Sequence, residues 1–190
     1  MIIEKPYAPR VLHLLIAAGL IIGAFSGPQA TAQEKNTAQE QSTTGGADRA
    51  IGATGFLVPR FVSLGVGKAN MRVGPKQSHP IVWEYQKKGL PLEILQEHES
   101  WRKVRDIDGA VGWMHKQLLV GKRSAIITAD WAEIRDLPDV LSIMVIRAER
   151  GVTVKVEECQ IDWCLVNVDG EEGWVPKSSL WGVYADEMFD

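Results

Sequence analysis

Two stretches of this chain repeat each other, and this repeat restricts what the chain can fold into. Residues 101–119 read WRKVRDIDGAVGWMHKQLL, and residues 163–181 read WCLVNVDGEEGWVPKSSLW. In both, a Trp opens an apolar strand, an Asp-Gly pair turns the chain, a Gly-Trp pair begins the return strand, and a Lys and a Leu follow. Such self-similarity inside one chain of 190 residues predicts tandem copies of a small structural unit.

The two copies align from residue 61 onward with an offset that falls in single steps. The landmark pairs are Arg72 and Arg135, Gly89 and Gly151, and Trp113 and Trp174, which lie 63, 62 and 61 residues apart. Two single-residue deletions in loops would produce this drift. The link near residues 120–124 is short, which indicates packed units rather than freely hinged ones.

Each copy contains the pattern of short strands. The alternating apolar positions are Leu90, Leu92 and Ile94 in the first copy and Val152, Val154 and Val156 in the second. This period of two is that of a half-buried strand. The Asp-Gly pair of each copy predicts a type I′ hairpin turn, and the run after each Gly-Trp pair predicts a single helical turn. About five strands in roughly 60 residues, without a helical period, predict a small antiparallel barrel. The expected fold class is therefore all-β, with two tandem five-stranded barrels at residues 56–121 and 122–190.

The first 32 residues have the pattern of a secretory signal peptide. Lys5 and Arg10 precede an apolar run at residues 11–25, and Ala30-Thr31-Ala32 is a small-x-small cleavage site. The alternative is an uncleaved membrane anchor, but the run falls short of the roughly 20 residues that span a bilayer. We expect cleavage, no stable membrane span afterwards, and a periplasmic or secreted protein. Residues 33–55 are rich in Gln, Thr, Ala and Gly and predict a disordered tether.

The two cysteines, Cys159 and Cys164, enclose four residues. In an oxidising compartment a pair this close is a candidate disulfide between adjacent antiparallel strands. The alternative is two unpaired thiols. Strict alternation puts Cys159 on the face opposite Val154 and Val156, so the bridge is expected outside the core unless a bulge intervenes.

Along the two repeated units the chain resembles the bacterial Src-homology-3-like domains, which are small five-stranded barrels of exported bacterial proteins. The resemblance rests on NMRVGP at 70–75, GLPLEIL at 89–95, ESWRKV at 99–104 and the Gly-Trp return strands. The second copy matches less well at its entry, where RDLPD replaces RVGPK. The resemblance covers about residues 61–183. It implies binding to cell-wall material, peptides or proteins, and its motifs indicate fold rather than activity.

Seven tryptophans suggest a binding surface, because aromatic faces stack on sugars and on extended peptides. Four occupy matched positions in both copies and are interpreted as structural, namely Trp101, Trp113, Trp163 and Trp174. Ile81 and Trp83 align with apolar residues, Ile143 and Val145, which indicates a core-facing strand. Tyr85 aligns with Arg147, which indicates a surface position.

Trp131 and Trp181 have no aromatic counterpart in the other copy. They either line an exposed groove or seal one barrel against the other, and we favour the seal. The binding candidates are therefore Tyr85, Trp131, Arg147 and Trp181. A proline-peptide groove would also need acidic loop residues, for which the candidates are Glu97, Glu99, Asp106 and Asp108. The simpler interpretation of those four is a solvated polar loop.

A hydrolase would need a nucleophile and a base, and the available set is Cys159 or Cys164 with His98 or His115. A disulfide would remove the thiolate, so we expect no enzyme activity. The histidines, including His79, lack metal-ligand spacing, and no P-loop or dinucleotide pattern is present in the sequence. We therefore expect no metal and no cofactor.

The functional prediction is an exported, non-catalytic binding module that recognises cell-wall peptidoglycan, as peptide or glycan, or a periplasmic protein. The alternative is a structural or assembly subunit whose barrel faces associate with a partner or with another copy. Net charge is −3, which gives no general attraction to nucleic acid or to anionic lipid.

Overall fold

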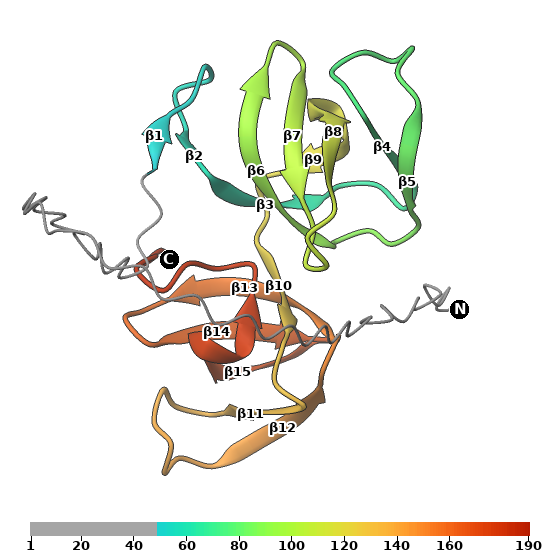
Figure 1. The fold of residues 1–190 in the computed structure, drawn as a ribbon. Helices are drawn as coiled ribbons and strands as arrows, with labels where there is room; N and C mark the ends of the chain where they lie inside the picture. The colour runs from blue at the N-terminus through green and yellow to red at the C-terminus, as the bar shows by residue number, and fades with distance from the viewer. Residues whose placement is uncertain (1–48) are drawn as a thin grey trace, which may run out of the picture. The chain divides into compact units, whose positions relative to one another are not determined.

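The computed structural model describes residues 49–190, and these residues form two seven-stranded antiparallel sheets and one small hairpin without an α-helix (Figure 1). The all-β fold class with two tandem units is confirmed. The predicted signal peptide and residues 33–48 of the predicted tether lie outside the described residues. Within the described part, no helix is long and apolar enough to cross a membrane.

The first sheet has the strand order β5-β4-β8-β7-β6-β3-β9. Its strands are β3 (Arg60–Leu64), β4 (Ala69–Arg72), β5 (Ile81–Tyr85), β6 (Pro91–His98), β7 (Trp101–Arg105), β8 (Val111–His115) and β9 (Leu119–Val120). A 3-10 turn, η1 (Lys116–Leu118), precedes β9 as the sequence predicted.

The second sheet repeats this order as β12-β11-β15-β14-β13-β10-β16. Its strands are β10 (Ser124–Ile127), β11 (Trp131–Arg135), β12 (Met144–Glu149), β13 (Thr153–Cys159), β14 (Trp163–Val168), β15 (Glu171–Pro176) and β16 (Leu180–Trp181), with the 3-10 turn η2 (Lys177–Ser179) before β16. Each sheet has seven strands rather than the five predicted, because alternation does not reveal two-residue strands such as β9. The outermost strands do not pair with each other, so hydrogen bonding does not close either barrel.

A hairpin precedes the first barrel. In it β1 (Ala50–Ile51) pairs with β2 (Leu57–Val58). Thr54, at its turn, donates from its backbone N to Glu97 Oε2 at 2.8 Å and from its Oγ1 to Glu97 Oε1 at 2.7 Å. Ordered structure therefore begins before Phe56, where the sequence placed its start. Composition missed this order because the contact that fixes the hairpin comes from β6, far along the chain.

The two Asp-Gly turns differ from each other. Asp169 and Gly170 both have positive φ and form the predicted two-residue turn. In the first copy the loop is longer and only Gly109 has positive φ. There Asp106 accepts from the backbone N of Ala110 at 2.8 Å, so a carboxylate-capped loop replaces the predicted type I′ turn.

The glycine of each Gly-Trp pair lets two strands approach closely. A Cβ added to Gly173 would lie 2.6 Å from Ile134 Cγ2 and 2.8 Å from the carbonyl oxygen of Arg135, on β11. Gly112 has the same relation to β4 in the first barrel, with Met71 Cγ at 2.6 Å. The repeated motif is therefore a requirement of the crossing between these strands.

Gly173→Ala is accordingly expected to lower the free energy of unfolding by about 1–3 kcal/mol, because the backbone of Arg135 cannot yield to a methyl group as a flexible side chain would. Urea denaturation measures this effect. Gly121→Ala is the matched control, since no atom lies within 4 Å of the added Cβ there and its φ is not positive. Equal stability of the two variants would contradict the proposed role of Gly173.

A β-bulge occurs at equivalent places in the two barrels. The register of β6 with β7 shifts between Ile94 and Gln96, and that of β13 with β14 shifts between Val156 and Glu158. The extra residue turns the following side chains to the other face. Cys159 therefore points into the core with Val154 and Val156, which is the exception that the sequence analysis allowed for.

The residues after each bulge cross-link the two strands. Cys159 faces Cys164 and forms a disulfide with it, as predicted. At the equivalent positions of the first barrel Glu97 faces Arg102, and Arg102 Nε lies 3.4 Å from Glu97 Oε1. These two side chains are only 2% and 5% exposed. One barrel thus uses a buried ion pair where the other uses a covalent bond.

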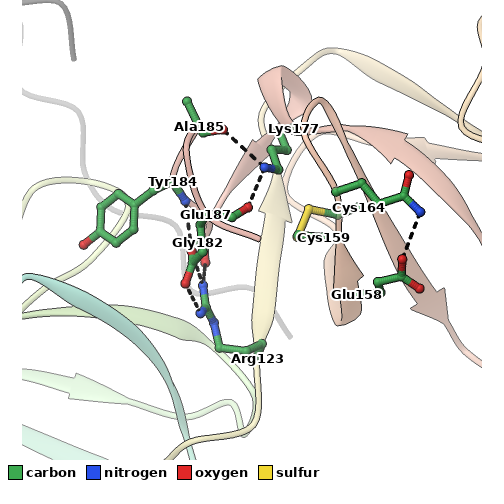
Figure 2. Close-up of a disulfide and its surroundings, with 10 residues drawn as sticks. Arg123, Glu158, Cys159, Cys164, Lys177, Gly182, Tyr184, Ala185 and Glu187 are labelled. Carbon is green, nitrogen blue, oxygen red and sulfur yellow. Dashed lines mark hydrogen bonds and ion pairs between the residues drawn. A yellow bond between two sulfur atoms is a disulfide. The ribbon is translucent and has the colours of Figure 1, made fainter. Parts of the chain in front are cut away.

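The C-terminal segment packs beside the disulfide (Figure 2). Phe189 and Cys159 exchange both backbone hydrogen bonds, at 2.8 and 3.0 Å. Lys177, which is buried, donates from Nζ to the carbonyl oxygens of Ala185 and Glu187 at 3.2 and 2.5 Å. The carboxylate of Glu187 in turn pairs with Arg123. Backbone pairing and charge therefore fix residues 182–190 on the second barrel.

The link between the barrels is also packed. Ser63 Oγ lies 2.6 Å from Ser124 Oγ and donates to the carbonyl oxygen of Lys122. The ring of Phe61 lies edge-on to that of Trp181, with centroids 5.1 Å apart. Tyr184 Oη donates to Glu93 Oε1 at 2.8 Å.

Candidate functional site

A groove of about 560 Å³ lies on the first barrel between β4 and the end of β8. Its lining comes from β4 and the residue before it, the β4–β5 loop, β7, β8 and η1. The lining residues are Lys68, Ala69, Asn70, Arg72, Gln77, Trp101, His115, Gln117 and Leu118. The strand order brings these segments together, because β4 pairs with β8 and β8 with β7.

Asn70 supplies the most informative atom of this groove. Its Oδ1 is buried, and none of residues 49–190 donates a hydrogen bond to it. Buried polar atoms nearly always have a partner, and leaving one unpaired costs about 1–3 kcal/mol. A ligand that places an N–H donor against Asn70 Oδ1 would recover that free energy.

The other polar groups give the groove a positive character. Lys68 lines the groove, and its Nζ lies 3.1 Å from Oε2 of Glu84, a residue outside the lining. Arg72 donates from Nη1 to the carbonyl oxygen of His79 at 2.7 Å. Among the described residues that line the groove there is no Asp and no Glu. The two cations therefore favour a ligand that carries a carboxylate or another anionic group.

Trp101 supplies an aromatic surface at one side of the groove. Its ring lies edge-on to that of His115, with centroids 5.5 Å apart, and His115 Nδ1 accepts from the backbone N of Gln117 at 3.4 Å. The half-buried indole keeps part of its surface available for stacking. Trp101 was predicted to be structural because the second copy repeats it, and this prediction hid its place in the groove.

The second barrel does not repeat the chemistry of this groove. Strand register aligns the groove residues of β4 and β8 with different side chains on β11 and β15. The changes are Trp131 for Lys68, Glu133 for Asn70 and Pro176 for His115, whereas Arg135 and Trp163 match Arg72 and Trp101. A cation, the unpaired amide and an imidazole are thus absent from the equivalent positions.

Two of the four predicted binding residues come together on the second barrel. Trp131 is 51% exposed, and the guanidinium carbon of Arg147 lies 5.0 Å from the centroid of its ring. Trp181 lies instead against Phe61 in the link between the barrels, as the seal interpretation expected. The ring contact that the structure shows for Trp131 is with Arg147, within its own barrel.

The prediction that Tyr85 lies on the surface is wrong. Its side chain is 6% exposed, and its Oη donates to Asp106 Oδ2 at 2.9 Å. Burial and the negative charge of Asp106 raise the pKa of Tyr85 far above its ordinary value. The error is one of alignment. Strand register pairs Tyr85 with Ala69 and Ala148 with Ala132, so the true counterpart of Tyr85 is Ala148 rather than Arg147.

The same misalignment affects the rest of β5. The offset of 63 persists through this strand, and the deletion falls in the loop after it. Ile81 and Trp83 were predicted to face the core, yet both are exposed. Their assigned counterparts, Ile143 and Val145, are exposed as well.

Two of the four acidic candidates for a proline-peptide groove are engaged elsewhere. Glu97 binds Thr54, Arg60 and Arg102, and Asp106 binds Tyr85. Neither carboxylate lines the groove of the first barrel.

Both cysteines form the disulfide, so neither supplies a thiolate for the Cys-His pair that the sequence offered. Among residues 49–190 no group of three or more His, Cys, Asp or Glu side chains is arranged to hold a metal ion.

These features define a tandem of small β domains with Gly-Trp return strands. The family model for the bacterial SH3 domain matches residues 65–121 and 128–182, which is more than half of the chain. The chain belongs to this family. Domains of the SH3 type bind peptides or proteins.

Solved structures with some similarity include NlpC2 from Trichomonas vaginalis, at 15% identity and a TM-score of 0.31 over 65% of this chain and 48% of that one. NlpC1 from the same organism has 16% identity and a TM-score of 0.30, over 64% of this chain and 45% of that one. An NlpC/P60 family protein from Bacillus cereus has 12% identity and a TM-score of 0.30, over 64% of this chain and 55% of that one. This chain spans about half the length of these solved chains, and similarity at this level carries no argument about function. No curated protein matches the chain.

Proposed function

We propose that this protein is an exported binding module that holds a peptide of the cell wall, or an extended segment of a periplasmic protein, in the groove of its first barrel. The Oδ1 of Asn70 carries the proposal, because it is a buried acceptor for which the described part of the chain supplies no donor. A peptide backbone supplies N–H donors of the kind this atom lacks. The family supports a binding role.

Three further properties of the groove fit a peptide. Trp101 offers a face for a side chain or a sugar ring. Gln77 and Gln117 carry amides that can donate to and accept from a second peptide group. Lys68 and Arg72, in a lining without acidic residues, would favour a free carboxylate, which neutral glycan alone does not provide.

Location outside the cytoplasm is part of the same proposal. The Cys159–Cys164 disulfide is compatible with an oxidising compartment. The sequence of residues 1–32 supplies the other support, and those residues are proposed to be removed on export. The domain limits proposed from the sequence, 56–121 and 122–190, accompany this assignment.

Isothermal titration of the mature protein with soluble peptidoglycan fragments tests the proposal. Asn70→Ala is expected to weaken binding about tenfold, because one hydrogen bond to a buried acceptor is lost. Glu133→Ala is the matched control, since Glu133 holds the equivalent position in the second barrel and is exposed. The melting temperature of Asn70→Ala should not fall below that of the wild type, because the substitution removes an unpaired buried acceptor, and that of Glu133→Ala should stay close to it.

Saturable binding that Asn70→Ala weakens and Glu133→Ala leaves intact would support the groove. Equal binding by both variants and the wild type would place the ligand elsewhere. Failure to bind intact wall, soluble fragments or a periplasmic extract would reject the binding role itself.

A further inference from the structure

The hairpin of β11 and β12 exposes an unusual run of large apolar side chains. The exposed members are Trp131, Leu137, Val140, Leu141, Ile143, Met144 and Val145. Leu141 is 90% exposed and Ile143 is 73% exposed. Exposed apolar side chains gathered on one hairpin commonly mark an interaction site in a folded protein. We call these seven residues the hairpin surface.

The hairpin surface sits on an ordered support. The backbone N of Asp136 donates to the carbonyl oxygen of Ile143 at 3.0 Å, across the base of the loop. Ser142 Oγ donates to the carbonyl oxygens of Leu137 and Asp139 at 2.9 and 2.8 Å. The apolar side chains are therefore held outward by a hydrogen-bonded loop, and association would require little ordering of the chain.

The first barrel does not share this feature at its own hairpin tip. Residues 74–80 read GPKQSHP, whereas the equivalent residues 137–143 read LPDVLSI. Both barrels use the same strands to carry the hairpin, so the fold does not require an apolar tip. The apolar residues at the tip of the second hairpin therefore serve some purpose other than folding.

The strand that carries the surface is an edge. β12 is the last strand in the order of its sheet and pairs only with β11 among the described strands (Figure 1). An edge strand can pair with an identical strand in antiparallel fashion about a two-fold axis, and each contact is then made twice. Because Met144 and Val145 lie on the strand itself, that pairing would cover them together with the free backbone groups.

The exposed area suits such a dimer. At their exposed fractions the seven residues, summed over both faces of the hairpin, leave roughly 800 Å² on one copy, which is about the area that one partner contributes to an interface of standard size. Charge argues against a lipid surface as the occupant. Residues 130–150 carry five acidic side chains and three arginines, so an anionic membrane would repel the hairpin.

We infer that two copies of this chain associate through the hairpin surface, with the β12 edges side by side. The interface lies on the second barrel, and none of the seven residues of the hairpin surface lines the groove of the first barrel. A dimer would carry two such grooves, and simultaneous engagement of two sites on one polymer strengthens retention without any new contact.

Sedimentation velocity of the mature protein over a wide concentration range tests this inference. The wild type is expected to sediment as a dimer that dissociates on dilution, and Val145→Glu is expected to weaken dimerisation about a hundredfold by burying a charge in the interface. Val82→Glu is the matched control. Val82 holds the equivalent position on β5 and is 45% exposed, against 44% for Val145. Leu141→Glu is a second variant at a site where folding cannot depend on packing.

A dimer that both Val145→Glu and Leu141→Glu disrupt and Val82→Glu preserves would support the inference. A wild type that stays monomeric at every concentration would overturn it, as would equal disruption by Val82→Glu. Vesicles of phosphatidylcholine and phosphatidylglycerol examine the lipid alternative. Retention of a monomeric wild type on these vesicles, lost in Val145→Glu, would also overturn it.

Discussion

Glu97→Gln is expected to lower the free energy of unfolding by about 3 kcal/mol at neutral pH, because it removes the charge that two buried or half-buried arginines face. The side chain of Glu97 is 2% exposed. Its Oε1 lies 2.7 Å from Arg60 Nη2 and 3.4 Å from Arg102 Nε. Thr54 donates to both carboxylate oxygens, so the variant would also loosen the β1–β2 hairpin. Urea denaturation followed by tryptophan fluorescence measures the loss.

Glu84→Gln is the control, because Glu84 pairs with Lys68 on an exposed surface. Exposed ion pairs contribute little, and the expected change is below about 1 kcal/mol. If the two variants lost the same stability, the buried network around Glu97 would not matter for folding.

The same carboxylate sets a pH dependence. Burial by itself would raise the pKa of Glu97, but the hydrogen bonds from Thr54 and Arg60 and the charge of Arg60 outweigh it and lower the pKa to about 2. An unfolded Glu has a pKa of about 4.3. A carboxylate with a depressed folded pKa stabilises the fold above the unfolded pKa and loses that contribution as pH falls toward the folded pKa. The stability gap between wild type and Glu97→Gln should therefore narrow between about pH 5 and pH 2.

Loss of the disulfide is expected to have an effect of similar size in the other barrel. For the double variant Cys159→Ala and Cys164→Ala, the loop-entropy model predicts a loss of about 2 kcal/mol for so short a loop, and truncating two buried side chains adds to it. Phe189 pairs with Cys159, so faster hydrogen exchange should appear at the C-terminal segment. Thermal denaturation with and without reductant gives the comparison.

The two cross-links also provide controls for each other. Reductant should destabilise the wild type and leave the stability of the double cysteine variant unchanged. Because Glu97 and the disulfide belong to different sheets, their effects should add when the substitutions are combined. An interaction energy well above about 0.5 kcal/mol would mean that the barrels unfold as one coupled core.

The sequence predicted the architecture because its signals are local. The Asp-Gly turns, the alternation at Val152, Val154 and Val156, and the Gly-Trp pairs each constrain a few neighbouring residues, and their repetition doubled the evidence. The reason for the Gly of the Gly-Trp pair came only from the structure, where Gly173 meets the backbone of β11.

The candidate site was much less predictable. Asn70 is an ordinary polar residue in a strand, and only the packing of β4 against β8 shows that its Oδ1 is buried without a partner. Trp131 and Arg147 were found separately by comparing the copies, and their contact depends on the register of β11 with β12. Tyr85 was predicted on the wrong face of β5 because the alignment of the two copies placed a single-residue deletion before β5 instead of after it. In a strand, an error of one residue reverses the face.

The sequence by itself determined that this chain is a tandem of two small β domains, because hydrophobic period and turn chemistry are properties of short segments. Only the tertiary structure decided which residues face inward after the two bulges. One extra residue in β6 and one in β13 turn Glu97 and Cys159 into the barrels, where each finds its partner across the strand pair. The ion pair of one barrel and the disulfide of the other are equivalent because the bulges are equivalent. The equivalence depends on the register of paired strands, and register is set by contacts between strands rather than by the sequence of either strand alone.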